Sequence, residues 1–108
     1  MSENHSKENR WKKQAAALRY HAQEDPAPRI IGLGQGFIAE KMLQTAEEQG
    51  VAVVKDPELS QVLQHLEVGD DIPPELYQVV AEILMFVAKL DGDQGKRFGV
   101  DGYLRHLK

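Results

Sequence analysis

The stretch from residue 29 to residue 54 constrains the fold more than any other part of this sequence. Residues 29–33 (RIIGL) form a β-branched run bounded by proline and glycine, which predicts a buried strand. An apolar spacing close to 3.6 residues follows from residue 37 and ends at Gly50, where glycine is typical of a helix C-terminus. Residues 51–54 (VAVV) predict a second strand. Such a strand–helix–strand unit predicts parallel strands joined by a right-handed crossover.

Two more helices are predicted after this unit. Asp56 and Pro57 mark a helix start, because aspartate is a favoured N-cap and proline is favoured at the first helical position. The apolar residues between 59 and 66 then line one face. A double proline at 73–74 opens the last helix, whose apolar stripe extends to residue 90. That stripe predicts a helix that faces the core, although its first turns fit a docking surface as well.

The segment 14–21 (QAAALRYH) is ambiguous on local grounds. Its alanines favour a helix, but it is short and ends at a proline-rich turn that would let it pair antiparallel with residues 29–33. The two ends of the chain lack an apolar period. We therefore expect a disordered lead over 1–11, one folded domain over 12–90 and a flexible tail over 91–108, which holds four glycines.

These elements predict an α/β fold, in which a small mixed β-sheet of about three strands packs with about three helices in a single domain. The net charge of −4 argues against nucleic acid as a partner. The longest apolar run, residues 83–88, is far shorter than the roughly 20 residues of a membrane-spanning helix, and the polar residues 1–10 lack the apolar stretch that a signal peptide would have. Without cysteine, the chain has no disulfide or thiolate site. We expect a cytoplasmic protein with no direct membrane insertion.

The polar residues do not form a catalytic or metal-binding pattern. The four histidines are never three or four residues apart, so they predict no metal site; they are His5, His21, His65 and His106. Paired carboxylates lie at predicted helix ends and turns, where they serve as caps or solvated charges. No serine stands in a nucleophile elbow. We therefore expect a binding module rather than an enzyme, with no cofactor.

A glycine-rich segment leaves one alternative open. Gly34, Gln35 and Gly36 lie between a predicted strand and a predicted helix, where backbone N–H groups can hold a phosphate. The spacing of the glycines at 32, 34 and 36 differs from both the dinucleotide and the Walker patterns. Close packing of the helix on the sheet explains the glycines equally well. Small-anion or nucleotide binding at residues 32–36 is thus the alternative hypothesis.

Eight short motifs follow one another along residues 14–90. They are ALRY at 17–20, APRII at 27–31, GQG at 34–36 with IA at 38–39, VAVV at 51–54, PELS at 57–60 with Leu63, EVG at 67–69, IP at 72–73 with LY at 76–77, and VAEIL at 80–84. Their order and spacing resemble the cytoplasmic C-terminal domain of the FlhB/YscU family, the export-gate switch proteins of flagellar and type III secretion systems. The resemblance implies that 14–21 is a strand.

The resemblance also implies what this chain lacks. Members of that family carry four transmembrane helices before the domain, and an Asn-Pro-Thr-His loop at which the chain cleaves itself through the asparagine side chain. Here the aligned positions are Arg10, Trp11, Lys12 and Lys13, so we expect no self-cleavage. The family strand that precedes the loop has no counterpart in the polar residues 1–9. The strand at 14–21 would then be an exposed edge, open to pairing with another chain.

The sequence therefore predicts a non-cleaving interaction module of the flagellar or type III export apparatus. We expect it to dock on, or to substitute for, the C-terminal domain of the membrane-bound export switch protein, peripherally at the inner-membrane export gate. Its partners would be protein components of that apparatus. The candidate partner-binding residues are Trp11, Ala15, Ala17, Arg19 and Tyr20, together with the adjoining turn at 22–28.

Overall fold

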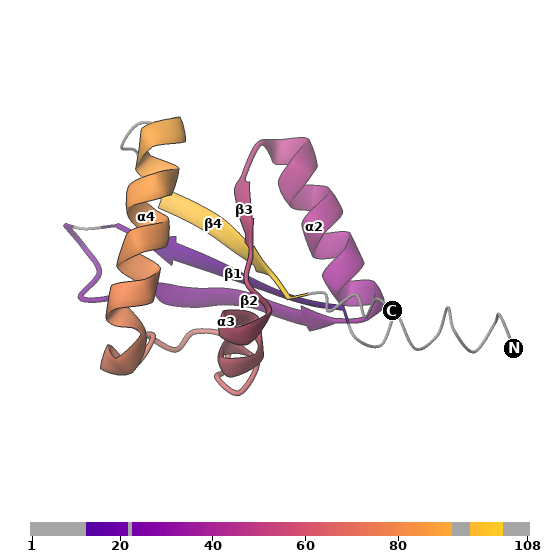
Figure 1. The fold of residues 1–108 in the computed structure, drawn as a ribbon, viewed down its shortest axis with the longest axis horizontal. Coiled ribbons are helices and arrows are strands. Elements are labelled where there is room, and N and C mark those ends of the chain that lie inside the picture. The colour runs from indigo at the N-terminus through magenta and orange to yellow at the C-terminus, as the bar shows by residue number, and fades with distance from the viewer. Residues whose placement is uncertain (1–12, 22, 92–95, 103–108) are drawn as a thin grey trace, which may run out of the picture.

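Four strands form one mixed sheet in the spatial order β2-β1-β4-β3. The structure, a computed structural model, describes residues 13–21, 23–91 and 96–102. The strands are β1 (Gln14–Tyr20), β2 (Arg29–Gln35), β3 (Ala52–Lys55) and β4 (Lys96–Asp101). The helices are α2 (Phe37–Gln49), α3 (Pro57–Leu63), the short 3₁₀ turn η1 (Pro74–Leu76) and α4 (Tyr77–Asp91). Figure 1 shows α2 and α4 flanking the sheet.

The predicted class, a small mixed sheet with helices in one domain, is confirmed, but the sheet has four strands rather than three. The additional strand is β4, which falls inside the segment predicted to be a flexible tail. That prediction is wrong for residues 96–101, because β4 pairs antiparallel with β1 and parallel with β3. The N-terminal lead predicted for residues 1–11 lies outside the described residues.

The pairing of the other strands agrees with the sequence. β1 runs antiparallel to β2, with a bulge between Ala17 and Leu18. β2 and β3 run parallel to each other, since both are antiparallel to β1. They are not neighbours, however, because β1 and β4 lie between them. The crossover through α2 therefore spans the width of the sheet.

The helix boundaries have the predicted local causes. The Oδ1 atom of Asp56 accepts the backbone N–H of Leu59 at 3.0 Å, so Asp56 caps α3 as expected. Gly50 ends α2 in the left-handed conformation, with φ 72°, which glycine adopts at little cost. In the described part of the chain, no helix combines the length and apolar character that crossing a membrane requires.

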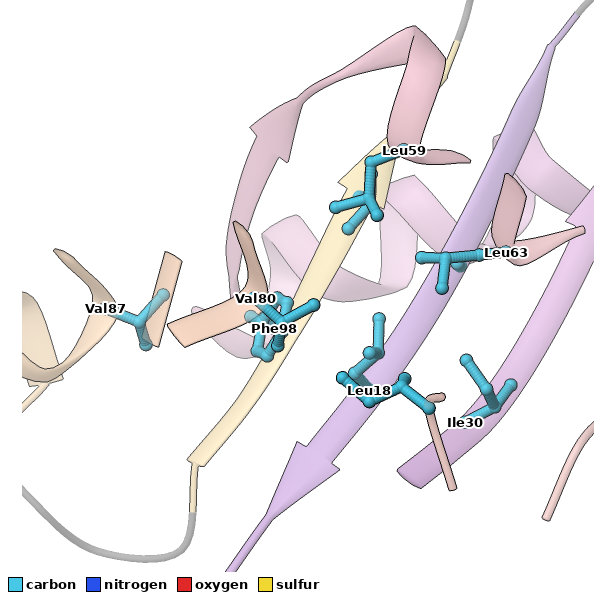
Figure 2. Close-up of a cluster of buried hydrophobic side chains, with 10 residues drawn as sticks. Leu18, Ile30, Leu59, Leu63, Val80, Val87 and Phe98 are labelled. Atoms are coloured by element: carbon cyan, nitrogen blue, oxygen red, sulfur yellow. The ribbon is translucent and has the colours of Figure 1, made fainter. Parts of the chain in front are cut away.

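The hydrophobic core lies between one face of the sheet and helices α3 and α4 (Figure 2). The sheet contributes Leu18 of β1 and Phe98 of β4 to this core, α3 contributes Leu63, and α4 contributes Val80 and Val87. Each of these side chains is at most 1% exposed. One side of the apolar stripe of α4 thus packs in the core, as the sequence predicted.

The opposite face of the sheet is built from small residues so that α2 can approach it. A Cβ atom at Gly34 would lie 2.7 Å from Ile38 Cγ2 and 2.7 Å from Met42 Sδ. Ala39 is fully buried at this contact. Phe37 and Ile38, which begin the predicted apolar period, are instead mostly exposed.

Candidate functional site

The predicted docking edge does not exist in this fold. Strand β1 pairs with β2 on one side from Gln14 to Arg19, and with β4 on the other from Ala15 to Tyr20. The prediction of an exposed edge at β1 is therefore wrong, because β4, which lies in the segment predicted to be a tail, covers that edge. Backbone pairing of a partner with β1 would require β2 or β4 to leave.

The predicted partner-binding residues have different environments in the structure. Ala15 is buried and Ala17 is half-buried, and both line a hollow of about 270 Å³ between the sheet and the second half of α2. Arg19 and Tyr20 lie at the other end of β1, beside the turn that follows it. Trp11 lies outside the described residues. Only the pair Arg19 and Tyr20 therefore remains next to the predicted docking turn.

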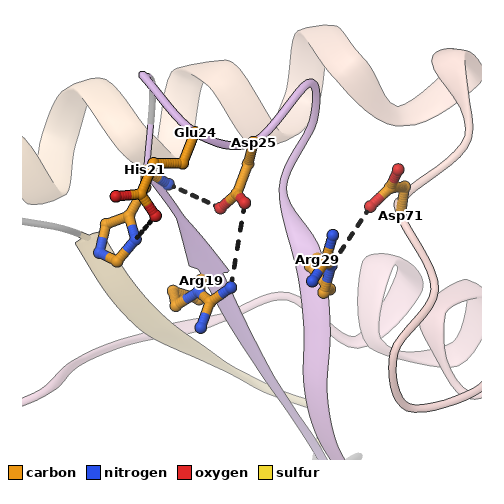
Figure 3. A network of polar contacts seen from close by, with 6 residues as sticks. All are labelled: Arg19, His21, Glu24, Asp25, Arg29 and Asp71. Carbon is orange, nitrogen blue, oxygen red and sulfur yellow. Dashed lines mark hydrogen bonds and ion pairs between the residues drawn. The ribbon is translucent and has the colours of Figure 1, made fainter.

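Polar contacts hold that turn against the end of β1 (Figure 3). Asp25 is buried, and its Oδ2 accepts the backbone N–H of His21 at 3.0 Å. The backbone N–H groups of Glu24 and Asp25 donate to the carbonyl oxygen of His21 at 2.9 and 2.8 Å. Arg19 Nη2 lies 3.9 Å from Asp25 Oδ1. The turn is thus fixed by its own backbone and by one buried carboxylate.

A second set of contacts fixes the start of β2. Arg29 Nε lies 3.5 Å from Asp71 Oδ1, and the backbone N–H of Ile72 donates to the carbonyl oxygen of Pro28 at 2.9 Å. The backbone N–H of Ile30 donates to the carbonyl oxygen of Asp70. The outer edge of β2 is therefore covered by the segment that leads to η1.

Between this turn and α4 lies an apolar hollow of about 180 Å³, which we call the turn–helix hollow. It is lined by Tyr20, Pro26, Ala27, Pro28, Tyr77, Ala81 and Leu84. Its volume is below the roughly 300 Å³ at which small-molecule sites begin. The hollow therefore fits one anchoring apolar side chain of a protein partner better than it fits a cofactor.

Exposed apolar side chains extend the hollow along α4. Tyr77 is 46% exposed and Met85 is 65% exposed, and Ala81 between them is also exposed. Spacings of four residues place these three side chains on one stripe of the helix. An exposed apolar stripe beside a hollow is characteristic of a protein-interaction surface.

The sequence predicted the turn, and it left open whether the first turns of the last helix belong to the core or to a docking surface. Val80 and Val87 lie in the core. The stripe is nevertheless broader than the core contact, so Tyr77, Ala81 and Met85 remain outside it. The width of the stripe was the available indication of a second contact surface.

The alternative site at Gly34, Gln35 and Gly36 has a packing explanation in the structure. Because Gly34 has no side chain, Ile38 and Met42 of α2 can pack closely against it. The backbone N–H of Gly36 donates to the carbonyl oxygen of Lys13 at 2.9 Å, and Gly36 has a φ of 62°, which favours glycine. No observation in the described residues favours an anion there.

The equivalent of the cleavage loop lies mostly outside the described residues, which include Lys13 but not Arg10, Trp11 or Lys12. Lys13 Nζ forms an ion pair with Glu40 Oε2 at 3.1 Å. Among the residues that the structure describes, no three histidine, aspartate or glutamate side chains gather as a metal site would require.

Comparison with known proteins yields matches of family, sequence and structure. A family described as "FlhB HrpN YscU SpaS Family" matches residues 12–87. The uncharacterized protein YlqH of Bacillus subtilis is 43% identical over 79 residues, which make up 73% of this chain and 85% of that protein. The flagellar biosynthetic protein FlhB of Aquifex aeolicus is 42% identical over 74 residues, or 68% of this chain. Those residues are only 21% of that FlhB.

Solved structures resemble the same part of the chain. A mutated EscU C-terminal domain superposes with a TM-score of 0.70 at 26% identity, covering 74% of this chain and 98% of that domain. The PscU C-terminal domain superposes with a TM-score of 0.64 at 30% identity, covering 68% of this chain and 94% of that domain. The shared architecture is therefore that of a complete C-terminal domain in those proteins.

Proposed function

Because this chain belongs to the FlhB/HrpN/YscU/SpaS family, we propose that it is a non-cleaving interaction module of the flagellar or type III export apparatus. It docks on the membrane-bound export switch protein, or substitutes for the C-terminal domain of that protein. The observation that carries the proposal is the turn–helix hollow. It joins the turn at 23–28, one half of the predicted docking surface, to an exposed apolar stripe on α4.

The hollow supports docking because its walls are already formed. Ala27 and Pro28 are buried, and Asp25 fixes the turn that carries them. A rigid apolar pocket loses little conformational entropy when an anchor side chain enters it. Anchors of this kind dominate the binding energy of protein interfaces. The partner is therefore expected to insert an apolar side chain between the turn and α4.

The aligned residues Arg10, Trp11, Lys12 and Lys13 support the non-cleaving part of the proposal. They provide no asparagine nucleophile and no proline leaving group. The chain would therefore contribute a docking surface to the export gate without a cleavage event of its own, from a peripheral position on the cytoplasmic side.

The test is a binding measurement with the membrane-bound switch protein of the same organism, truncated at its cleavage loop. The variant Ala81→Asp places a charge on the α4 wall of the hollow, and Gln78→Asp places the same charge on an exposed position of α4 that does not line it. We expect Ala81→Asp to weaken binding at least tenfold and Gln78→Asp less than twofold. Failure of the unmodified chain to bind at micromolar concentration contradicts the proposed docking, and equal binding by Ala81→Asp excludes this surface.

A further inference from the structure

Three arginines lie side by side across the sheet. Arg19 of β1 is the direct cross-strand partner of Arg29 of β2 on one side and of Arg97 of β4 on the other. Their strand neighbours point into the core formed with α3 and α4; these neighbours are Ile30, Leu18 and Phe98. Because side chains alternate along a strand, the three arginines lie together on the opposite face, against which α2 packs. We call them the arginine row, and Figure 3 shows two of its members, Arg19 and Arg29, on neighbouring strands.

The carboxylates among the described residues neutralise this row only in part. Asp71 Oδ1 lies 3.5 Å from Arg29 Nε. Asp25 Oδ1 lies 3.9 Å from Arg19 Nη2. Both distances are longer than the roughly 2.8 Å of a close charge-assisted hydrogen bond. In the described part of the chain, Arg19 Nε is buried without a hydrogen-bond acceptor, and no carboxylate forms an ion pair with Arg97.

This arrangement has a cost for the fold. Like charges that lie directly opposite each other destabilise a sheet. Natural proteins break such rules of local stability mainly at functional sites. The arginine row therefore indicates a surface that attracts an anionic partner.

An apolar hollow adjoins the arginine row on the same face of the sheet. This sheet–helix hollow is the space of about 270 Å³ beside the second half of α2, and Arg97 belongs to its lining. Its walls include Ile31 and Val53, which are 39% and 37% exposed. Small residues of the sheet, among them Ala17 and Gly99, leave the space between these walls open. The face thus combines an apolar recess with positive charge at its margin.

The width of the arginine row indicates what kind of ligand fits. Neighbouring strands lie about 4.8 Å apart, so the backbones that carry Arg29 and Arg97, two strands apart, are separated by about 9.6 Å. One small carboxylate cannot contact both ends of such a row, whereas two acidic side chains of a peptide can. Arginine binds carboxylates in a bidentate manner, and complementary charge selects partners at protein interfaces. An apolar side chain beside the two acids would then enter the hollow.

We propose that the arginine row and the sheet–helix hollow form a binding site for an acidic segment of a partner protein. Two carboxylates of the segment lie on the row, and one apolar side chain fills the hollow. The net charge of −4 over the whole chain opposes extended anionic surfaces such as nucleic acid or a membrane more than it opposes a short acidic segment. No residue lines both this hollow and the turn–helix hollow, so either surface can fail as a binding site without affecting the other.

Binding of short peptides to the whole chain tests the site. Fluorescent peptides carry two glutamates and one leucine in a glycine–serine background, and the spacing between the leucine and the glutamates is varied across the set. In matched peptides, glutamine replaces both glutamates or serine replaces the leucine. We expect the best acidic peptide to bind at least tenfold more tightly than either counterpart. Its affinity should fall as salt is added, because salt screens contacts between exposed charges.

Variants of the chain locate the bound peptide. Arg97→Glu should weaken binding of the best peptide at least tenfold. Lys41→Glu makes the same change of charge at an exposed position of α2 that does not line the hollow, and it should weaken binding less than threefold. Ala46→Leu fills the hollow from the side of α2 and should weaken binding at least fivefold. The urea midpoint of Arg97→Glu should not fall below that of the unmodified chain, because the change removes a like charge from the row.

Three results would overturn the proposal. The first is an acidic set in which no peptide binds more tightly than its glutamine counterpart, or in which Lys41→Glu weakens binding as much as Arg97→Glu. The second is a clear fall in the urea midpoint of Arg97→Glu, because the arginine would then serve the fold. The third is co-sedimentation with phosphatidylglycerol vesicles that Arg97→Glu abolishes, in the absence of peptide binding, because the row would then contact a lipid surface.

Discussion

Asp25 folds back onto His21, whose backbone N–H donates to Asp25 Oδ2 at 3.0 Å. The same carboxylate lies 3.9 Å from Arg19 Nη2 and is almost entirely buried. One side chain therefore holds together the end of β1 and the turn that forms a wall of the turn–helix hollow.

Replacing Asp25 by alanine should destabilise the domain. The part-buried backbone N–H of His21 would lose its acceptor, and a donor left unpaired in this way typically costs about 1–3 kcal/mol. Asp25→Asn keeps an oxygen acceptor and should cost less. The free energy of unfolding from urea titration measures both effects. If the two variants unfold at the same urea concentration as the unmodified chain, the carboxylate does not hold the turn.

A methyl group at Gly34 should disturb the packing of α2 on the sheet. Its Cβ would lie 2.7 Å from two side-chain atoms of α2 and 3.2 Å from the backbone nitrogen of Ala39, so the side chains of Ile38 and Met42 must shift and the helix has to give slightly. Overpacking of this kind costs about 1–3 kcal/mol. Thermal unfolding followed by circular dichroism measures the loss.

Gly32→Ala is the matched control for that change. A Cβ at Gly32 would meet Met42 Cε at 3.3 Å and Ala17 Cβ at 3.5 Å, and the end of a methionine side chain moves easily. We expect a loss below about 1 kcal/mol. Comparable losses from both variants would mean that the contact with α2 does not set the requirement for glycine.

The chain should remain uncut during storage and purification. Self-cleavage at the aligned loop requires an asparagine nucleophile, and residues 10–13 are Arg-Trp-Lys-Lys. Mass spectrometry of the purified protein after days at 25 °C should give a single species with the mass of the full chain. A fragment beginning near residue 11 would contradict the alignment on which the non-cleaving role rests.

Local chemistry was sufficient to predict most of the fold. The helix start at Asp56, the helix end at Gly50 and the strand at 29–33 each follow from residues within one turn of the feature. The strand character of 14–20 was not predictable in this way, because its alanines favour a helix and only tertiary pairing with β2 and β4 makes it a strand. Local propensity is a weak guide where the partners are distant in sequence.

The error at β4 had a similar cause and changed the candidate site. Gly99 and Gly102 made residues 96–102 look like a tail, whereas Gly102 is required by the backbone approach to Ser60. Placing β4 beside β1 removed the exposed edge and, with it, the predicted edge-pairing surface. Whether the first turns of α4 belong to the core or to a docking surface stayed open for a different reason. Periodicity shows that a helix is apolar on one side, but not how much of that side the core covers.

A substitution at Phe98 distinguishes a core strand from a tail. Phe98 is 1% exposed in the core between β1 and α4, so Phe98→Ala should cost about 3–5 kcal/mol and lower the unfolding midpoint in urea. The neighbouring Arg97 lies on the opposite face of the same strand and is exposed, so Arg97→Ala should change stability by less than about 0.5 kcal/mol. Unchanged stability of Phe98→Ala would mean that residues 96–101 do not complete the sheet in solution, and β1 would again be an open edge for a partner strand.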